Sequence, residues 1–163
     1  MTSRNIKSYE LITDELVKET LEKDKGKKAE LLSWEIRDFT KKGDNFASTV
    51  TSVVVKYKEN NICCEESYVA KLNPLRPQST FTEIMEDLYS RETVILSSII
   101  EGMNKHLGKL GLPFLKTPKM FARNLERGKE AFIAENLRNQ GFKMPDRKKS
   151  LNVNHANLVM EEL

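Results

Sequence analysis

The sequence predicts an α+β fold in which one long helix packs on a five-stranded antiparallel sheet. Three stretches alternate apolar and polar residues or are rich in Val and Thr, at 32–36, 46–57 and 63–72, and polar turns join them. A long segment, 81–103, follows with apolar residues every three or four positions. Two short apolar runs, 119–123 and 131–137, then complete the predicted sheet.

Size and composition indicate one globular domain. The chain has 163 residues, of which 39% are hydrophobic and 31% charged, enough to bury a core. No stretch approaches the roughly 18 apolar residues of a membrane span, and no apolar run follows the basic residues at the N-terminus. We therefore expect a cytoplasmic protein that does not associate with a membrane.

Charge and metal-binding residues exclude two further classes of function. Twenty-seven Lys and Arg against 24 Asp and Glu give a net charge of +3, and no aromatic residues interleave the basic runs, so we expect no nucleic-acid binding. Cys63 and Cys64 are adjacent, and His106 and His155 lie far apart in the sequence. This spacing suits no metal site.

Helical patterns flank the predicted sheet. Thr13 can cap a helix in which Leu16, Val17 and Leu21 repeat at helical spacing, and a charged loop ends it near Lys28. In the first strand, Leu32, Trp34 and Ile36 are the side chains expected to face the core. The apolar stripe of the long helix is likewise expected to be core; its members are Phe81, Ile84, Met85, Leu88, Val94, Ile95, Ile99, Ile100 and Met103.

A last helical pattern starts near Asp146, after a turn at Gln140-Gly141. Its apolar side is formed by Leu151, His155, Leu158, Val159 and Leu163. Because this stripe continues to the terminus without a capping residue, we expect the sequence to be part of a longer protein. The expected division is an N-terminal helix and loop at 1–28, a central lobe at 29–137, and a connection with the first helix of another lobe at 138–163.

Three segments of the chain are candidates for holding a nucleotide. The turn Gly43-Asp44-Asn45-Phe46-Ala47-Ser48 could present backbone N–H groups to phosphate oxygens, although such residues are also ordinary turn formers. Lys71 stands among apolar residues of a strand, where its ammonium needs a partner, unless it only protects an edge strand. Glu92, near the middle of the long helix, is the preferred partner, with Glu83 and Glu86 as alternatives.

This order of elements is that of the small lobe of a protein-kinase-like fold. There, a first hairpin covers ATP, a lysine of the third strand meets its phosphates, and a helix carboxylate orients the lysine. The segment that leaves the fifth strand would then join the two lobes and meet the adenine through its backbone. In this chain that segment is Glu135-Asn136-Leu137.

The chain resembles the ecdysteroid kinase-like family and, more distantly, the choline and aminoglycoside kinases. The residues that carry the resemblance are Gly43 to Ser48, Val69 to Pro74, Glu92 with Ile95, Leu96, Ile99 and Ile100, Pro118 to Phe121, Ala134 to Leu137 with Gly141 and Phe142, and Leu151 with His155 and Ala156. The resemblance implies ATP- and magnesium-dependent phosphorylation of a hydroxyl group on a small alcohol, with ecdysteroids among the substrates. It gives Lys71, Glu92 and the Gly43 to Ser48 turn the task of positioning phosphates.

Two departures from the family pattern stand out. Ala134 and Asn136 replace a larger apolar residue and an Asp near the lobe-joining segment. The catalytic His-Gly-Asp, the Asn that follows it and the later magnesium-binding Asp do not occur in these 163 residues. We therefore expect the chain alone to be inactive, either as the nucleotide-binding segment of a longer kinase or as a non-catalytic binding or regulatory module.

Overall fold

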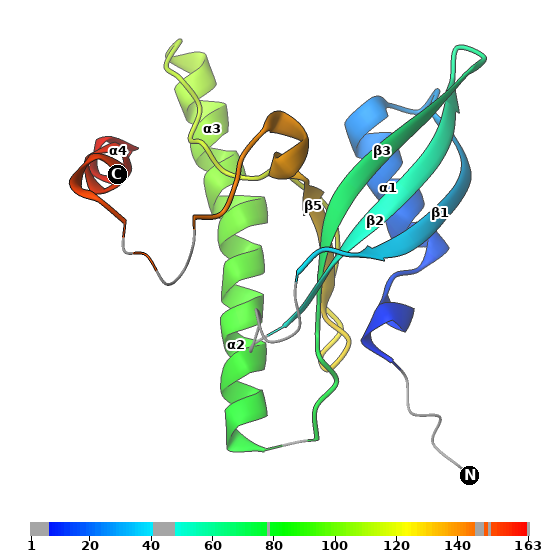
Figure 1. The fold of residues 1–163 in the computed structure, drawn as a ribbon, viewed down its shortest axis with the longest axis horizontal. Helices are drawn as coiled ribbons and strands as arrows, with labels where there is room; N and C mark the ends of the chain where they lie inside the picture. Colours follow the sequence, from blue (N-terminus) through cyan, green and yellow to red (C-terminus); the bar gives the residue numbers. More distant parts are fainter. Residues whose placement is uncertain (1–6, 41–47, 78, 146–148, 150, 163) are drawn as a thin grey trace.

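The computed structural model confirms an α+β fold with one five-stranded antiparallel sheet (Figure 1). It describes residues 7–40, 48–77, 79–145, 149 and 151–162. The strands are β1 (Glu30–Asp38), β2 (Thr49–Glu59), β3 (Ile62–Leu72), β4 (Met120–Asn124) and β5 (Ala131–Glu135), in the order β1-β2-β3-β5-β4. The helices are α1 (Asp14–Lys25), α2 (Thr80–Val94), α3 (Ile100–Lys109) and α4 (Val153–Glu162), with short helices η1 (Ser8–Leu11), η2 (Ile95–Ile99) and η3 (Leu137–Gln140).

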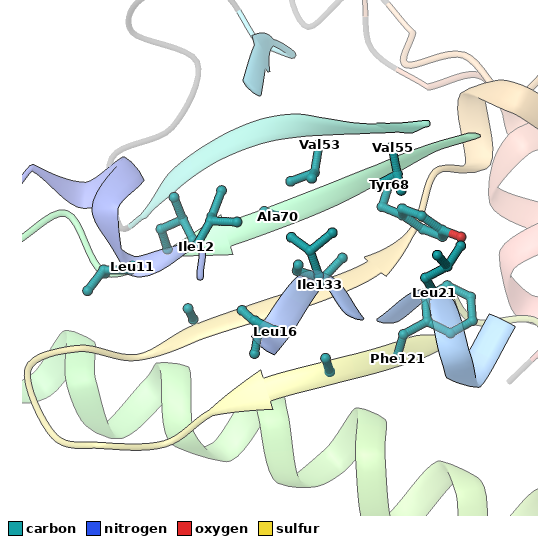
Figure 2. Close-up of a cluster of buried hydrophobic side chains, with 14 of the residues drawn as sticks. Leu11, Ile12, Leu16, Leu21, Val53, Val55, Tyr68, Ala70, Phe121 and Ile133 are labelled. Carbon is teal, nitrogen blue, oxygen red and sulfur yellow. The ribbon is translucent and has the colours of Figure 1, made fainter. Parts of the chain in front are cut away.

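Helix α1 covers one face of the sheet and forms the main core with it. Its start is fixed by Thr13, whose hydroxyl accepts a hydrogen bond from the backbone N–H of Leu16 at 3.3 Å, as the sequence predicts. Val17 and Leu21 are fully buried against β4 and β5. Figure 2 shows Leu21 beside Tyr68 and Phe121, with Ile133 at the centre of the cluster.

A β-bulge in β1 overturns one predicted side-chain orientation. The pairing of β1 with β2 shifts between Leu31 and Ser33, so two residues of β1 oppose one position of β2. As a result Leu31 packs against the core, whereas Leu32, which strict alternation assigns to the core, is 51% exposed. Trp34 and Ile36 do pack against the core as predicted.

The predicted long helix is present as three consecutive segments, α2, the π-helical η2 and α3. The prediction that its apolar stripe is core is wrong for most members. Phe81, Ile84, Leu88, Val94, Ile95, Ile99 and Met103 are 42–52% exposed. The helix faces the sheet with a different set of residues. Among the described residues of α2, the buried ones are Glu86, Tyr89 and Thr93. An apolar stripe shows that a helix is amphipathic, but does not show which element covers it.

Helix α4 lies apart from the sheet (Figure 1). Its apolar residues Leu158 and Val159 are exposed. Leu163, which the sequence assigns to the same side, lies outside the described residues. Within the described ranges, no helix combines the length and apolar character that crossing a bilayer requires.

Candidate nucleotide-binding cleft

The face of the sheet opposite α1 forms one wall of a cleft of about 410 Å³. Side chains alternate along β3, so that Ala70 and Leu72 belong to the core under α1 while Val69 and Lys71 line the cleft. The neighbouring strands place Val50, Phe132 and Ala134 in register with these two residues. Leu96 of η2 and Pro118, in the segment before β4, also line the cleft.

Lys71 and Glu92 form an ion pair in this cleft, as the sequence predicts. The ammonium of Lys71 donates to Oε2 of Glu92 and lies 5.9 Å from the ring centroids of both Tyr89 and Phe132. Lys71 is about one-quarter exposed and Glu92 about two-fifths, so both charges remain accessible to a ligand. Glu86, an alternative partner in the sequence, instead pairs with Nε of Arg127 at 3.2 Å, and Glu83 is exposed.

Tyr89 is a site residue that sequence reasoning missed. It lies one helical turn before Glu92 and donates from its hydroxyl to the backbone carbonyl of Lys71 at 2.5 Å. Burial raises the pKa of this hydroxyl, and the negative charges of Glu92 and Glu130 raise it further, so it remains a donor at neutral pH. An aromatic residue three positions before the helix glutamate is the signal that could have indicated it.

The segment after β5 lies at the end of the cleft. Glu135 and Leu137 line the cleft. The buried Asn136 contributes to the other side of the segment, where its Nδ2 donates to Oγ of Ser67 at 2.8 Å and its Oδ1 accepts from the backbone N–H of Arg138 at 3.1 Å. The side chain of Asn136 therefore caps η3 and ties the segment to β3.

Phe39 and Arg138 also line the cleft, and no pattern in the sequence indicated either residue. The guanidinium carbon of Arg138 lies 3.7 Å from the ring centroid of Phe39, and its Nη1 donates to the Phe39 carbonyl at 2.8 Å. This stacking joins the end of β1 to η3, and both side chains line the cleft.

A model of the ecdysteroid kinase-like family matches residues 42–163, three-quarters of the chain. The chain belongs to the ecdysteroid kinase-like family. Membership indicates the chemistry of a kinase-like phosphotransferase that acts on small molecules. Searches among curated proteins and among solved structures found no significant match.

Two expectations from the ecdysteroid kinase-like pattern concern the phosphate-binding turn, Gly43 to Ser48, and the metal. Of the predicted turn, Gly43, Asp44, Asn45, Phe46 and Ala47 lie outside the described residues, and Ser48 is buried directly before β2. Among the residues that the structure describes, no group of three or more His, Cys, Asp or Glu side chains could hold a metal ion. The ion pair and the cleft beside it are therefore the main structural support for a functional site.

Proposed function

We propose that this cleft binds ATP and that the chain is the nucleotide-binding segment of an ATP-dependent kinase. The kinase would phosphorylate a hydroxyl group of a small alcohol, for which an ecdysteroid is the candidate that the family name suggests. The observation that carries this proposal is the Lys71–Glu92 ion pair at the edge of an apolar cleft. A paired lysine that stays accessible suits the binding of a phosphate group.

The proposal assigns a separate task to each group that lines the cleft. The ammonium of Lys71 meets phosphate oxygens, and the carboxylate of Glu92 orients it. The base lies over Val69 and Ala134, neighbours on the cleft face of β3 and β5 whose short side chains leave room for a flat ring. A cleft of about 410 Å³ suits a small ligand. The backbone of Glu135 to Leu137 borders the same space and can present polar groups to the edge of the base.

The structural support for the cleft does not extend to the Gly43 to Ser48 turn or to a metal ion. We propose that N–H groups of the turn meet phosphate oxygens, because Gly43 permits a tight turn. Magnesium, when bound with ATP, neutralises phosphate charge in such enzymes. Since the described residues form no metal cluster, no step is assigned to a metal held by them.

We further propose that these 163 residues bind the nucleotide without transferring its phosphate. The sequence contains no His-Gly-Asp, the motif in which the resemblance places the catalytic Asp. A non-catalytic binding module is the second candidate function, and it shares the same cleft. A phosphoryl-transfer assay with radiolabelled ATP and an ecdysteroid alcohol tests the inactivity, because transfer by the 163-residue chain would contradict it.

Replacing Lys71 tests the binding site itself. We expect Lys71→Ala to weaken ATP binding by about 10-fold or more, because a hydrogen bond to a charged group contributes about 1.5–3 kcal/mol. Glu92→Gln should weaken binding by a smaller factor, since the lysine keeps its charge. The measurement is a titration of the ¹⁵N-labelled chain with ATP and magnesium by NMR, which detects weak binding.

Lys56→Ala is the matched control for this experiment. Lys56 is an exposed lysine of β2 and does not line the cleft. Its removal changes the net charge by the same amount and should leave the affinity for ATP unchanged. Equal affinities of the wild-type chain and Lys71→Ala would overturn the assignment of the cleft.

A further inference from the structure

Helix α2 contacts the sheet through very few side chains. Its buried residues in the described chain are Glu86, Tyr89 and Thr93, and its large apolar residues Phe81, Ile84 and Leu88 are about half exposed. Tyr89 is thus the one large apolar side chain of α2 that is buried among the residues described, with only 6% of its surface exposed. The placement of α2, and of Glu92 on it, depends strongly on this side chain.

Tyr89 contacts the sheet at the position of Lys71. Its hydroxyl donates to the backbone carbonyl of Lys71 at 2.5 Å. Its ring packs against Phe132 with centroids 5.5 Å apart and planes at 49°. Phe132 is the register partner of Lys71 across β3 and β5. One tyrosine therefore contacts both the backbone of the lysine and the residue beside it.

We propose that Tyr89 is a positioning residue that sets the distance and orientation of Glu92 relative to Lys71. This inference rests on the proposed nucleotide-binding function and deepens it. Tyr89 and Glu92 are three residues apart, so their side chains leave the same face of α2. Tyr89 holds the main chain of Lys71 while Glu92 holds its ammonium, which fixes the lysine at both ends.

Hydroxyl groups of the same helix face donate to helix carbonyls around Tyr89. Thr93 donates from Oγ1 to the carbonyl of Tyr89 at 2.9 Å, and Ser97 donates to the carbonyl of Thr93 at 2.7 Å. The π-helical η2 begins at Ile95, directly after α2. Because both Tyr89 and Glu92 lie in α2, before this change of register, a regular α-helical turn fixes their spacing.

A double-mutant experiment separates positioning from general stability. Tyr89→Phe keeps the ring and removes only the hydroxyl. We expect it to weaken ATP binding by about 3- to 10-fold, because one hydrogen bond is worth about 0.5–1.5 kcal/mol. In a Lys71→Ala background the same change should leave ATP affinity unaltered, since no ammonium remains to be positioned. The loss of unfolding stability should be equal in both backgrounds, because the backbone carbonyl of residue 71 remains.

Tyr68→Phe is the matched control. Tyr68 is similarly buried on the opposite face of the sheet and donates to Oδ2 of Asp24 at 2.8 Å. Its loss should lower stability without changing ATP affinity. If Tyr89→Phe leaves ATP affinity unchanged, or weakens it equally in the Lys71→Ala background, the positioning role is overturned.

A readout without nucleotide keeps the inference separate from the proposed function. The ¹⁵Nζ signal of Lys71 reports the ammonium beside Glu92, and Tyr89→Phe should shift it while Tyr68→Phe should not. If the wild-type chain fails to bind ATP but this signal shifts, the proposed function fails and the positioning role stands. An unshifted signal overturns the positioning role whatever the result with ATP.

Discussion

At the scale of single residues, the hydrogen bonds of Asn136 show why a side-chain amide suits this position better than a carboxylate. The buried side chain acts as donor to Ser67 and as acceptor from the N–H of Arg138. The hydroxyl of Ser67 in turn donates to Oδ1 of Asn139 at 3.1 Å. An ionised Asp at position 136 could cap η3 but could not donate to Ser67.

We expect Asn136→Asp to destabilise the fold by about 1–2 kcal/mol at neutral pH, because it removes a buried hydrogen bond and adds a charge near Glu135 and Glu66. We expect these neighbouring carboxylates to raise the pKa of the new carboxyl. Its cost should therefore shrink as the pH falls through that raised pKa, since the folded state then takes up the proton. Urea unfolding at several pH values measures this, and a cost that does not decrease on acidification would contradict it.

At the scale of elements, β1 offers a direct comparison of two adjacent leucines. We expect Leu31→Ala to lower the free energy of unfolding by about 1–2 kcal/mol, because Leu31 packs against the core. Leu32→Ala removes the same atoms from an exposed position and should change stability by less than about 0.5 kcal/mol. Urea denaturation of both variants checks the bulge. A larger loss for Leu32→Ala than for Leu31→Ala would show instead that strict alternation holds.

These elements also show what the sequence can predict. Alternation and helical spacing predicted the strands and the long helix, because both patterns follow from local backbone geometry. The Lys71–Glu92 pair was predictable because an apolar strand makes an unpaired lysine costly. The exposure of Leu32 and of Ile99 was not predictable from the sequence. A bulge, and the choice of which helix face is covered, depend on contacts between residues far apart in the sequence. The same reason hid Tyr89, Phe39 and Arg138, which meet the site only once the sheet has formed.

At the scale of the whole molecule, a buried tyrosine on each face of the described sheet makes a hydrogen bond that holds a helix. Tyr68 bonds Asp24 at the end of α1, and Tyr89 bonds the carbonyl of Lys71 from α2. Burial raises the pKa of Tyr68 above its ordinary value of 10.0, and the hydrogen bond and charge of Asp24 add to it. Burial and the charge of Glu92 raise the pKa of Tyr89 in the same direction. Both helices thus depend on protonated phenols.

The chain should therefore lose stability in alkali. Below pH 10 both phenols are protonated in the folded and the unfolded chain, so their contribution is complete. Above pH 10 the unfolded chain releases these protons while the folded chain keeps them, and the free energy of unfolding falls as the pH rises. Tyr68→Phe and Tyr89→Phe should each make this fall shallower, although each starts about 1 kcal/mol lower at neutral pH. Urea unfolding from about pH 8 to about pH 11 measures the slopes. Tyr9→Phe, at an exposed position, should leave the slope unchanged, and a shallower slope in that variant alone would show that the buried phenols are not responsible.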